Sequence, residues 1–143
     1  MNQPRHLSSR RAFVDTSANF AVIDRRDAHH DSAIVISTRL ADQRWRLFTT
    51  NYILVETHAL FLARLGRAVV LNFLREIGPT TVRATETDER RAREIIERYS
   101  DKDFSLADAV SFSVMERLNI RSAFTFDQHF AQYGFTVLTP ELV

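Results

Sequence analysis

The sequence predicts a three-layer α/β/α domain with a short, mostly parallel central sheet. Short apolar runs alternate with longer segments that carry apolar residues at helical spacing. The chain has 143 residues, of which 45% are hydrophobic and 26% charged, which suits one folded domain and is too short for two. Strands separated by helices favour right-handed crossovers and a parallel sheet covered on both faces. We expect a flexible arm at residues 1–10 and a single domain at residues 11–143.

Five short apolar segments are predicted as strands, because polar residues or turn signals bound each of them. Two of them, RAFVD and AFTFD, run directly into an aspartate, and TVRA is expected at an edge of the sheet. In chain order, the predicted strands are residues 11–15, 46–49, 81–84, 123–127 and 135–138.

The segments between these strands are predicted as helices, and most begin at a residue that can cap a helix. Thr16 or Ser17 is expected to cap the helix that follows the first strand. Gly66, Gly78-Pro79 and Asn119 are suited to end three later helices. These later helices are expected at residues 28–43, from Thr50 or Asn51 to Leu65, at 67–77, from Thr87 to Tyr99, and from Ser105 to Leu118.

The composition excludes several classes of protein. The chain has no cysteine, so disulfides, thiolate zinc sites and a cysteine nucleophile are excluded. Residues 1–11 are polar and lack the apolar core of a secretory signal, and no apolar run approaches the roughly 20 residues that cross a bilayer. We therefore expect a soluble, cytoplasmic protein without a membrane segment. The net charge is +1 and Lys102 is the only lysine, so nearly all cations are arginines, which suit phosphate groups.

Asp15 and Asp127 each stand at the carboxyl end of a predicted strand. In open α/β sheets, ligands bind beyond the carboxyl ends of the strands, at the point where the strand order reverses. If both strands are central, both carboxylates face the same crevice. An aspartate after a strand can instead be a turn former or a helix cap.

Glu56 stands in the apolar helix TNYILVETHALFLARL, and helical spacing puts it on one stripe with Tyr52, Ile53 and Leu60. A carboxylate on a buried stripe is costly unless it is paired, hydrogen-bonded or bound to a metal. The competing interpretation is an ion pair with a nearby arginine such as Arg64.

Asp108 lies three residues after Ser105, a spacing that allows a capping box at the start of a helix. It also aligns with Phe112 and Met115, which directs it towards the core. A capping role and a site role are compatible. Together, the four carboxylates of Asp15, Glu56, Asp108 and Asp127 are expected to converge on one crevice. No lysine or arginine stands at a matching position to neutralise their charge. These like charges repel one another unless a cation or protons intervene, and oxygen ligands suit Mg²⁺ or Mn²⁺.

The motifs that contain these acids resemble those of PIN-domain proteins, and most closely the VapC-type toxin ribonucleases of bacterial toxin–antitoxin pairs. The motifs are VDTSA at residues 14–18, NYILVET at 51–57, DKDFSLADA at 101–109 and TFDQHF at 125–130. The resemblance extends from Phe13 to Leu138, with the acids in the order and approximate spacing of the family.

The resemblance implies which residues form the site. The four catalytic and metal-binding acids of the family correspond to Asp15, Glu56, Asp108 and Asp127. The hydroxyl groups of Thr16 and Thr125 match positions that support the acids, and Ser105 is expected to support Asp108. Whether Asp101 or Asp103 also reaches the site stays open.

The implied activity is metal-assisted hydrolysis of RNA phosphodiester bonds with Mg²⁺ or Mn²⁺, without a covalent intermediate. The implied partners are RNA, a cognate antitoxin and a second copy of the chain. The helices at residues 28–43 and 52–77 are expected to supply the groove for the antitoxin.

The sequence offers three alternatives to a toxin nuclease. The first is a phosphotransfer domain with Asp15 or Asp127 as nucleophile. Aspartate-based phosphatases have a second aspartate two residues after the first, where this chain has Ser17. Receiver domains have a lysine at a late strand, and the only lysine here is Lys102, so this alternative is disfavoured. The others are a PIN-domain RNA-processing nuclease without a toxin role and a non-catalytic PIN-like binding module. For His58 and His129, structural or surface roles are favoured over that of a general base.

Overall fold

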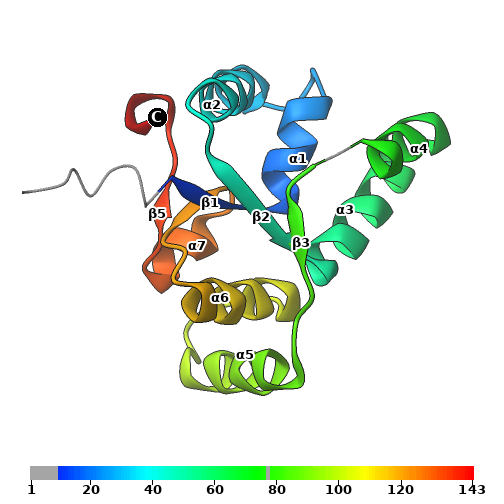
Figure 1. Cartoon of the computed structure of the whole chain (residues 1–143). Helices are drawn as coiled ribbons and strands as arrows, with labels where there is room; N and C mark the ends of the chain where they lie inside the picture. The colour runs from blue at the N-terminus through cyan, green and yellow to red at the C-terminus, as the bar shows by residue number, and fades with distance from the viewer. Residues whose placement is uncertain (1–9, 77) are drawn as a thin grey trace, which may run out of the picture.

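The computed structural model describes residues 10–76 and 78–143. They form three layers, in which a parallel five-stranded sheet lies between two layers of helices (Figure 1). The sheet order is β3-β2-β1-β4-β5, and every neighbouring pair is parallel. The strands are β1 (Arg11–Val14), β2 (Arg46–Thr50), β3 (Thr80–Val82), β4 (Ser122–Phe124) and β5 (Thr136–Val137). The predicted α/β/α class and the parallel sheet are confirmed.

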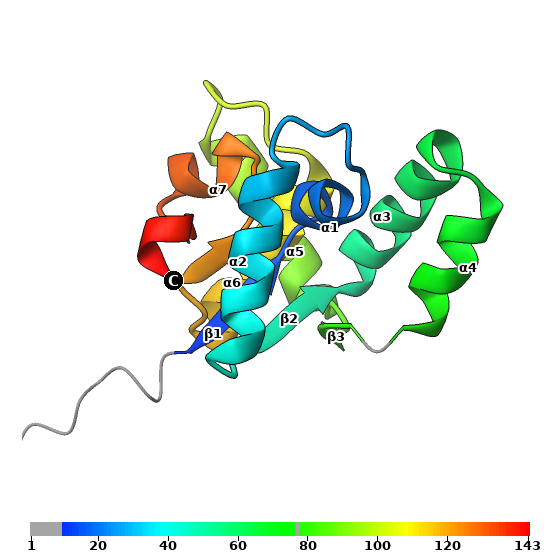
Figure 2. The same cartoon turned by 90° about the horizontal axis from the view of Figure 1, so that it is seen from above.

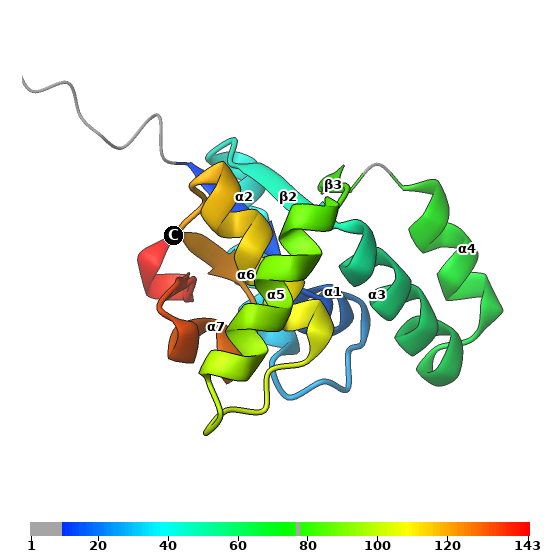
Figure 3. The same cartoon turned by 90° about the horizontal axis from the view of Figure 1, so that it is seen from below.

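The helices cover both faces of this sheet (Figures 2 and 3). They are α1 (Thr16–Ile23), α2 (His30–Asp42), α3 (Asn51–Arg64), α4 (Arg67–Arg75), α5 (Glu86–Arg98), α6 (Leu106–Leu118) and α7 (Gln128–Tyr133). A short 3-10 helix, η1 (Pro140–Leu142), follows β5. Among these described helices, none is long and apolar enough to span a bilayer.

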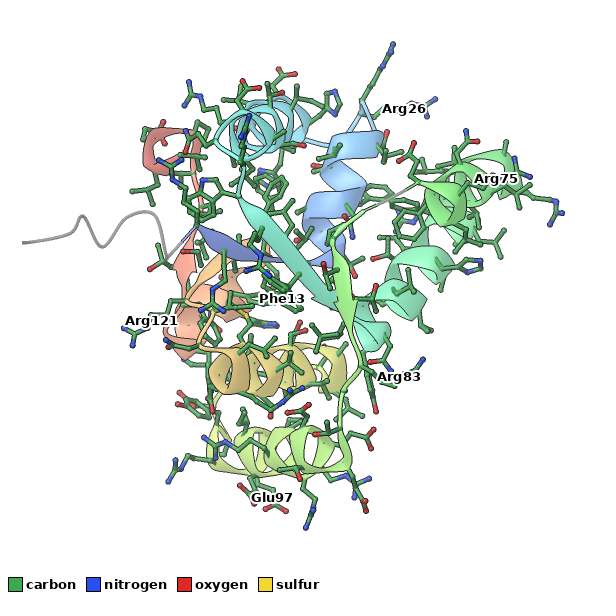
Figure 4. All side chains as sticks on the ribbon, viewed as in Figure 1. Phe13, Arg26, Arg75, Arg83, Glu97 and Arg121 are labelled. Carbon is green, nitrogen blue, oxygen red and sulfur yellow. The ribbon has the colours of Figure 1, made fainter. Side chains whose placement is uncertain are left out.

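Alternation along β1 divides the core between the two faces of the sheet. Phe13, at the centre of the sheet in Figure 4, belongs to a buried cluster that contains residues of α3, α5, α6 and α7. Its neighbours Ala12 and Val14 point to the opposite face and pack with α1 and α2. Successive side chains of a strand point to opposite faces, so a strand buried on both faces reads as a continuous apolar run.

The order of the strands brings the ends of β1 and β4 together. From β1, the chain adds β2 and β3 on one side and later adds β4 and β5 on the other. β1 and β4 are paired in register, with Val14 opposite Phe124, and the Asp15 amide donates to the Phe124 carbonyl over 3.1 Å. The order therefore reverses between these two strands, which is where a crevice is expected in a parallel sheet.

Several helix ends follow the predicted caps. Thr50 caps α3, Ser105 caps α6 through a capping box with Asp108, and Asn119 ends α6 in the left-handed conformation at φ 56°. Two predicted caps are wrong. Asp15, and not Thr16 or Ser17, caps α1, and Thr85, and not Thr87, caps α5. In both cases a capping residue one or two positions earlier has the extended backbone that a cap requires.

Some predicted boundaries also differ from the structure. The predicted strand at 123–127 ends at Phe124, because Asp127 instead caps α7, a helix that the sequence did not reveal. η1 was missed as well, β3 covers Thr80–Val82 in place of residues 81–84, and α2 begins at His30. Of the predicted arm, the structure describes only Arg10, which donates to the Gln43 carbonyl over 3.0 Å.

Candidate active site

Three of the four predicted acids meet where the strand order reverses. Asp15 caps α1, Asp127 caps α7, and Asp108 is the third residue of α6. Each carboxylate therefore lies at the start of a helix, where unpaired backbone N–H groups favour a negative charge. Asp15 and Asp108 are buried, whereas Asp127 is partly exposed.

One oxygen of Asp15 is held by hydrogen bonds from the protein. Its Oδ2 accepts from the Ser17 hydroxyl over 2.7 Å and from the Thr125 hydroxyl over 2.9 Å. The amide of Asp127 in turn donates to the Thr125 hydroxyl over 3.0 Å, which ties the end of β4 to the same network. The predicted supporting role of Thr125 matches this geometry, and Ser17 adds a second hydroxyl that sequence reasoning missed.

Asp108 and Asp127 are also each held through one carboxylate oxygen. Asp108 Oδ2 accepts from the Ser105 amide over 3.1 Å, as expected for the capping box, and lies 2.9 Å from His129 Nδ1. Asp127 Oδ1 accepts from the His129 amide over 2.9 Å and lies 3.3 Å from His129 Nδ1.

Each of the three aspartates thus keeps one oxygen free. Within residues 10–76 and 78–143, Asp15 Oδ1, Asp108 Oδ1 and Asp127 Oδ2 accept no hydrogen bond, yet no buried polar side-chain atom is left unsatisfied. These three oxygens are therefore not fully buried and keep some contact with solvent. No lysine or arginine in the described part of the chain pairs with any of these carboxylates.

The cluster makes ionisation of its most buried member unfavourable. Burial raises the pKa of Asp15 to about 6, hydrogen bonds from Ser17 and Thr125 act against this, and the charges of Asp108 and Asp127 raise it further. A bound cation would reverse the effect, because it favours the charged form of every carboxylate near it.

His129 joins two of the acids, a role that its sequence position did not reveal. Its side chain is 22% exposed, and its Nδ1 lies between Asp108 and Asp127. Carboxylate oxygens only accept hydrogen bonds when ionised, so Nδ1 must carry the proton in this arrangement. The ring also rests edge-on against Phe104, with centroids 5.4 Å apart. Asp108, Asp127 and His129 offer potential metal-ligand atoms within 4.8 Å of one another.

Glu56 does not lie on a buried stripe, and that part of its interpretation is wrong. The face of α3 that is buried contains Ile53, Thr57 and Phe61, whereas Glu56 is exposed. Glu56 and Arg64 form no ion pair among the described residues, so the competing interpretation is wrong as well. Helical spacing alone did not define the buried face, because this helix is apolar on nearly every side.

The contact between α3 and α1 sits one residue beyond Glu56. The Thr57 hydroxyl donates to the Thr16 hydroxyl over 3.0 Å, directly after Asp15 in the chain. Thr16 therefore contacts α3 and does not hold an acid by itself. Asp101 and Asp103 are exposed, and Asp101 pairs with Lys102 at 3.4 Å.

The comparisons with known proteins agree with this arrangement. The PIN domain family model matches residues 12–136. The chain belongs to the PIN-domain family. It is 35% identical over 133 residues to the 23S rRNA-specific endonuclease VapC20 of Mycobacterium tuberculosis, covering 90% of this chain and 98% of that protein. It is 32% identical over 124 residues to a VapC ribonuclease of Archaeoglobus fulgidus, covering 84% of this chain and 79% of that protein.

A solved structure supports the same relationship within the PIN-domain family. The crystal structure of VapC20 from Mycobacterium tuberculosis, described as a sarcin-ricin loop cleaving toxin, matches with a TM-score of 0.81 at 30% identity. The match covers 90% of this chain and 99% of that one. The resemblance to VapC-type PIN-domain toxin ribonucleases is confirmed.

Proposed function

We propose that the protein is a toxin ribonuclease that hydrolyses RNA phosphodiester bonds with the help of Mg²⁺ or Mn²⁺. The observation that carries this proposal is the division of each site aspartate into one oxygen held by the protein and one in contact with solvent. Free carboxylate oxygens without a cationic side chain are the ligands that hard divalent ions prefer.

Asp15, Asp108 and Asp127 would hold the metal, and Glu56 would join them from the exposed face of α3. When bound, the ion would activate a water molecule and stabilise the charge on the phosphate and its leaving oxygen. Ser17 and Thr125 fix the orientation of the Asp15 carboxylate, and His129 does the same for Asp108 and Asp127. No nucleophilic side chain is required.

The first test is RNA cleavage by the purified protein with Mg²⁺, with Mn²⁺ and with a chelator. Because the relatives named above are an rRNA endonuclease and a VapC ribonuclease, we propose ribosomal RNA as the first substrate to test. Asp15→Asn should abolish cleavage, since it removes a charge from the metal site at nearly constant shape. Cleavage at the wild-type rate by this variant, or in the presence of chelator, would contradict the proposal.

We further propose that an antitoxin binds in a groove between α2 and the pair α3–α4, the helices expected to supply it, and that α1 forms part of its wall. Two cavities of about 180 and 210 Å³ open there, and Asn19, Phe73 and Glu76 line both of them. Ile23 and Leu74, 44% and 53% exposed, add apolar surface beside the cavities. Co-purification with a small protein encoded next to the gene tests this binding.

We also propose that the protein is cytoplasmic, in keeping with an activity on RNA, and that it forms a homodimer. Sedimentation at micromolar concentration, with and without the partner protein, measures the oligomeric state. A monomer in both preparations would contradict the dimer and leave the nuclease activity unaffected.

A further inference from the structure

A cavity of about 480 Å³ opens beside the acids, and the proposed hydrolysis does not use it. Its walls come from α2, the turn between β4 and α7, α7 itself and the segment from β5 to η1. Figure 2 shows α7, η1 and α2 near one another. Thr125 and Asp127 line this cavity and also belong to the acid cluster. The cavity and the acid cluster therefore share two residues and lie next to each other.

The lining combines apolar walls with a few uncommitted polar side chains. The apolar residues are Ile36, Phe126, Ala131, Val137, Leu138 and Pro140. Ser32, Gln128 and Thr139 also line the cavity, and their side chains form no hydrogen bond with other described residues. Binding sites for small organic groups typically have this composition, with apolar walls for contact and a few polar groups for orientation.

An aromatic pair fixes one wall of the cavity. Phe126 stacks on His29 with ring centroids 4.6 Å apart and an interplanar angle of 6°. The amide of Phe126 donates to the Ser17 hydroxyl over 2.9 Å, and Ser17 also holds Asp15. The position of the Phe126 ring is thus coupled to the position of the catalytic acid.

We propose that this cavity binds an unpaired base of the RNA next to the cleaved phosphodiester, an inference that rests on the proposed ribonuclease function. Single-stranded RNA is recognised by bases that stack on aromatic rings and form hydrogen bonds along their edges. A base is flat and uncharged, with faces that match the apolar walls and edges that can form hydrogen bonds with the polar side chains. The carboxylates of Asp127 and Glu141 at the cavity would repel a second phosphate group. The free groups of Ser32, Gln128 and Thr139 would then select among the bases.

The direct test uses nucleosides, which carry a base and no phosphate. Uridine, cytidine, adenosine and guanosine are titrated separately into metal-free protein while backbone amide NMR shifts are followed. We expect saturable shifts at Gln128, Ala131 and Thr139 for at least one nucleoside. Ala131→Trp fills the cavity and should remove these shifts. Gln132→Trp is the matched control, because Gln132 is the next residue of α7, is exposed and does not line the cavity.

A second variant and a second ligand keep the test decisive. Ser32→Leu narrows the cavity from the α2 wall and replaces Ala131→Trp if that variant fails to fold. N-acetylarginine amide serves as a probe for a cationic side chain of a protein partner. Shifts with this compound and none with any nucleoside would overturn the assignment to an RNA base.

The same variants are then tested on an RNA that the wild-type protein cleaves. We expect removal of one base beside the cleaved bond to raise the KM of the wild type about tenfold, and Ala131→Trp to raise it similarly on intact RNA. Ala131→Trp should raise the KM little further when the RNA already lacks this base. Cleavage of RNA without nucleoside shifts would overturn the cavity assignment alone. Nucleoside shifts in a protein that cleaves no RNA would instead contradict the ribonuclease function.

Discussion

At the scale of single residues, the oxygens of each site aspartate serve two separate purposes. One oxygen is held by hydroxyl, amide or imidazole donors, which fix the plane of the carboxylate, and the other stays open to a ligand. Such supporting hydrogen bonds orient metal ligands, and their loss typically lowers metal affinity or activity 10–100-fold. His129 also joins two elements, α6 and α7.

The role of His129 can be separated from simple packing by two amide substitutions. An asparagine places its side-chain NH₂ near the position of Nδ1, whereas a glutamine places it near Nε2. We expect His129→Asn to keep most cleavage activity and Mn²⁺ affinity. His129→Gln and His129→Ala should lose about tenfold or more. Mn²⁺ binding followed by electron paramagnetic resonance, together with the metal dependence of kcat, measures this. Equal losses in all three variants would show that Nδ1 is not the important atom.

Asp15 gives a pH dependence with a defined sign. Its pKa is raised to about 6 in the folded protein, so the folded state binds more protons than the unfolded state between about pH 4 and pH 6. Stability in metal-free buffer should therefore fall as the pH rises through this range. Asp15→Asn removes the effect and should be more stable than the wild type at pH 7, by roughly 3 kcal/mol. At pH 4 the two proteins should differ little.

Urea unfolding of wild type and Asp15→Asn at pH 4 and pH 7 measures this difference. Asp42→Asn serves as the control, because Asp42 is exposed at the end of α2. If the wild type were as stable as Asp15→Asn at pH 7 without metal, the surroundings would not raise the pKa of the Asp15 carboxyl group.

At the scale of elements, α6 carries Asp108 and depends on α5 for its position. α6 is buried from Asp108 to Met115 between the sheet and α5, which crosses it in Figure 3. The two helices are joined by Asp88, which is 2% exposed and accepts from Arg117 Nε over 3.0 Å and Nη2 over 2.8 Å. Asp88 also closes the capping box of α5 with Thr85.

Removing Asp88 or Arg117 should lower the free energy of unfolding by weakening the contact between α5 and α6, and neither residue belongs to the acid cluster. Burial raises the pKa of Asp88, but hydrogen bonds from Arg117 and Thr85 outweigh it and hold the pKa below its usual value. Asp88→Ala should cost about 2–4 kcal/mol, since it removes one hydrogen bond of the α5 capping box and the buried carboxylate that Arg117 contacts. Asp88→Asn keeps an acceptor for the Thr85 amide and should cost less. Urea midpoints at pH 7 measure both, and equal losses would assign the effect to the charge alone.

At the scale of the whole molecule, the proposed metal binding would be coupled to folding, because an unfolded chain has no assembled site. Asp15, Asp108 and Asp127 lie after β1, in the first turn of α6 and after β4, respectively, and they meet only in the folded domain, where β1 and β4 are paired. Mn²⁺ at one hundred times its dissociation constant should stabilise the folded protein by about 2.7 kcal/mol. That corresponds to a rise of roughly 5–10 °C in Tm for a domain of this size.

Glu56→Gln tests whether the exposed glutamate of α3 joins this site. Because Glu56 is exposed, the substitution should change stability little without metal. If Glu56 is a ligand, Glu56→Gln should also weaken the Mn²⁺-induced rise in Tm. Thermal melts of both proteins over a Mn²⁺ series measure the two effects, with Glu97→Gln on the distant helix α5 as the control. An unchanged Mn²⁺ response would exclude Glu56 from the metal site.

Local sequence patterns determined the class of the fold and most of its elements. The apolar runs predicted every strand, and capping residues such as Thr50 and Ser105 predicted the starts of two helices. Two aspartates at strand ends correctly indicated where the acids gather. These features could be predicted because each depends on the period and caps of one segment, which neighbouring residues specify.

The tertiary structure alone decided how the site is built. The partners of His129 and Ser17, the free oxygen of each aspartate and the exposure of Glu56 depend on which segments lie across the crevice. The helix α7 was hidden because Asp127 reads equally well as the end of a strand or as a cap. The physical reason is that hydrogen bonds across the crevice join residues about 20 to 110 positions apart, and only the folded domain brings these residues together, through the pairing of β1 with β4 and the packing of α6 against α7.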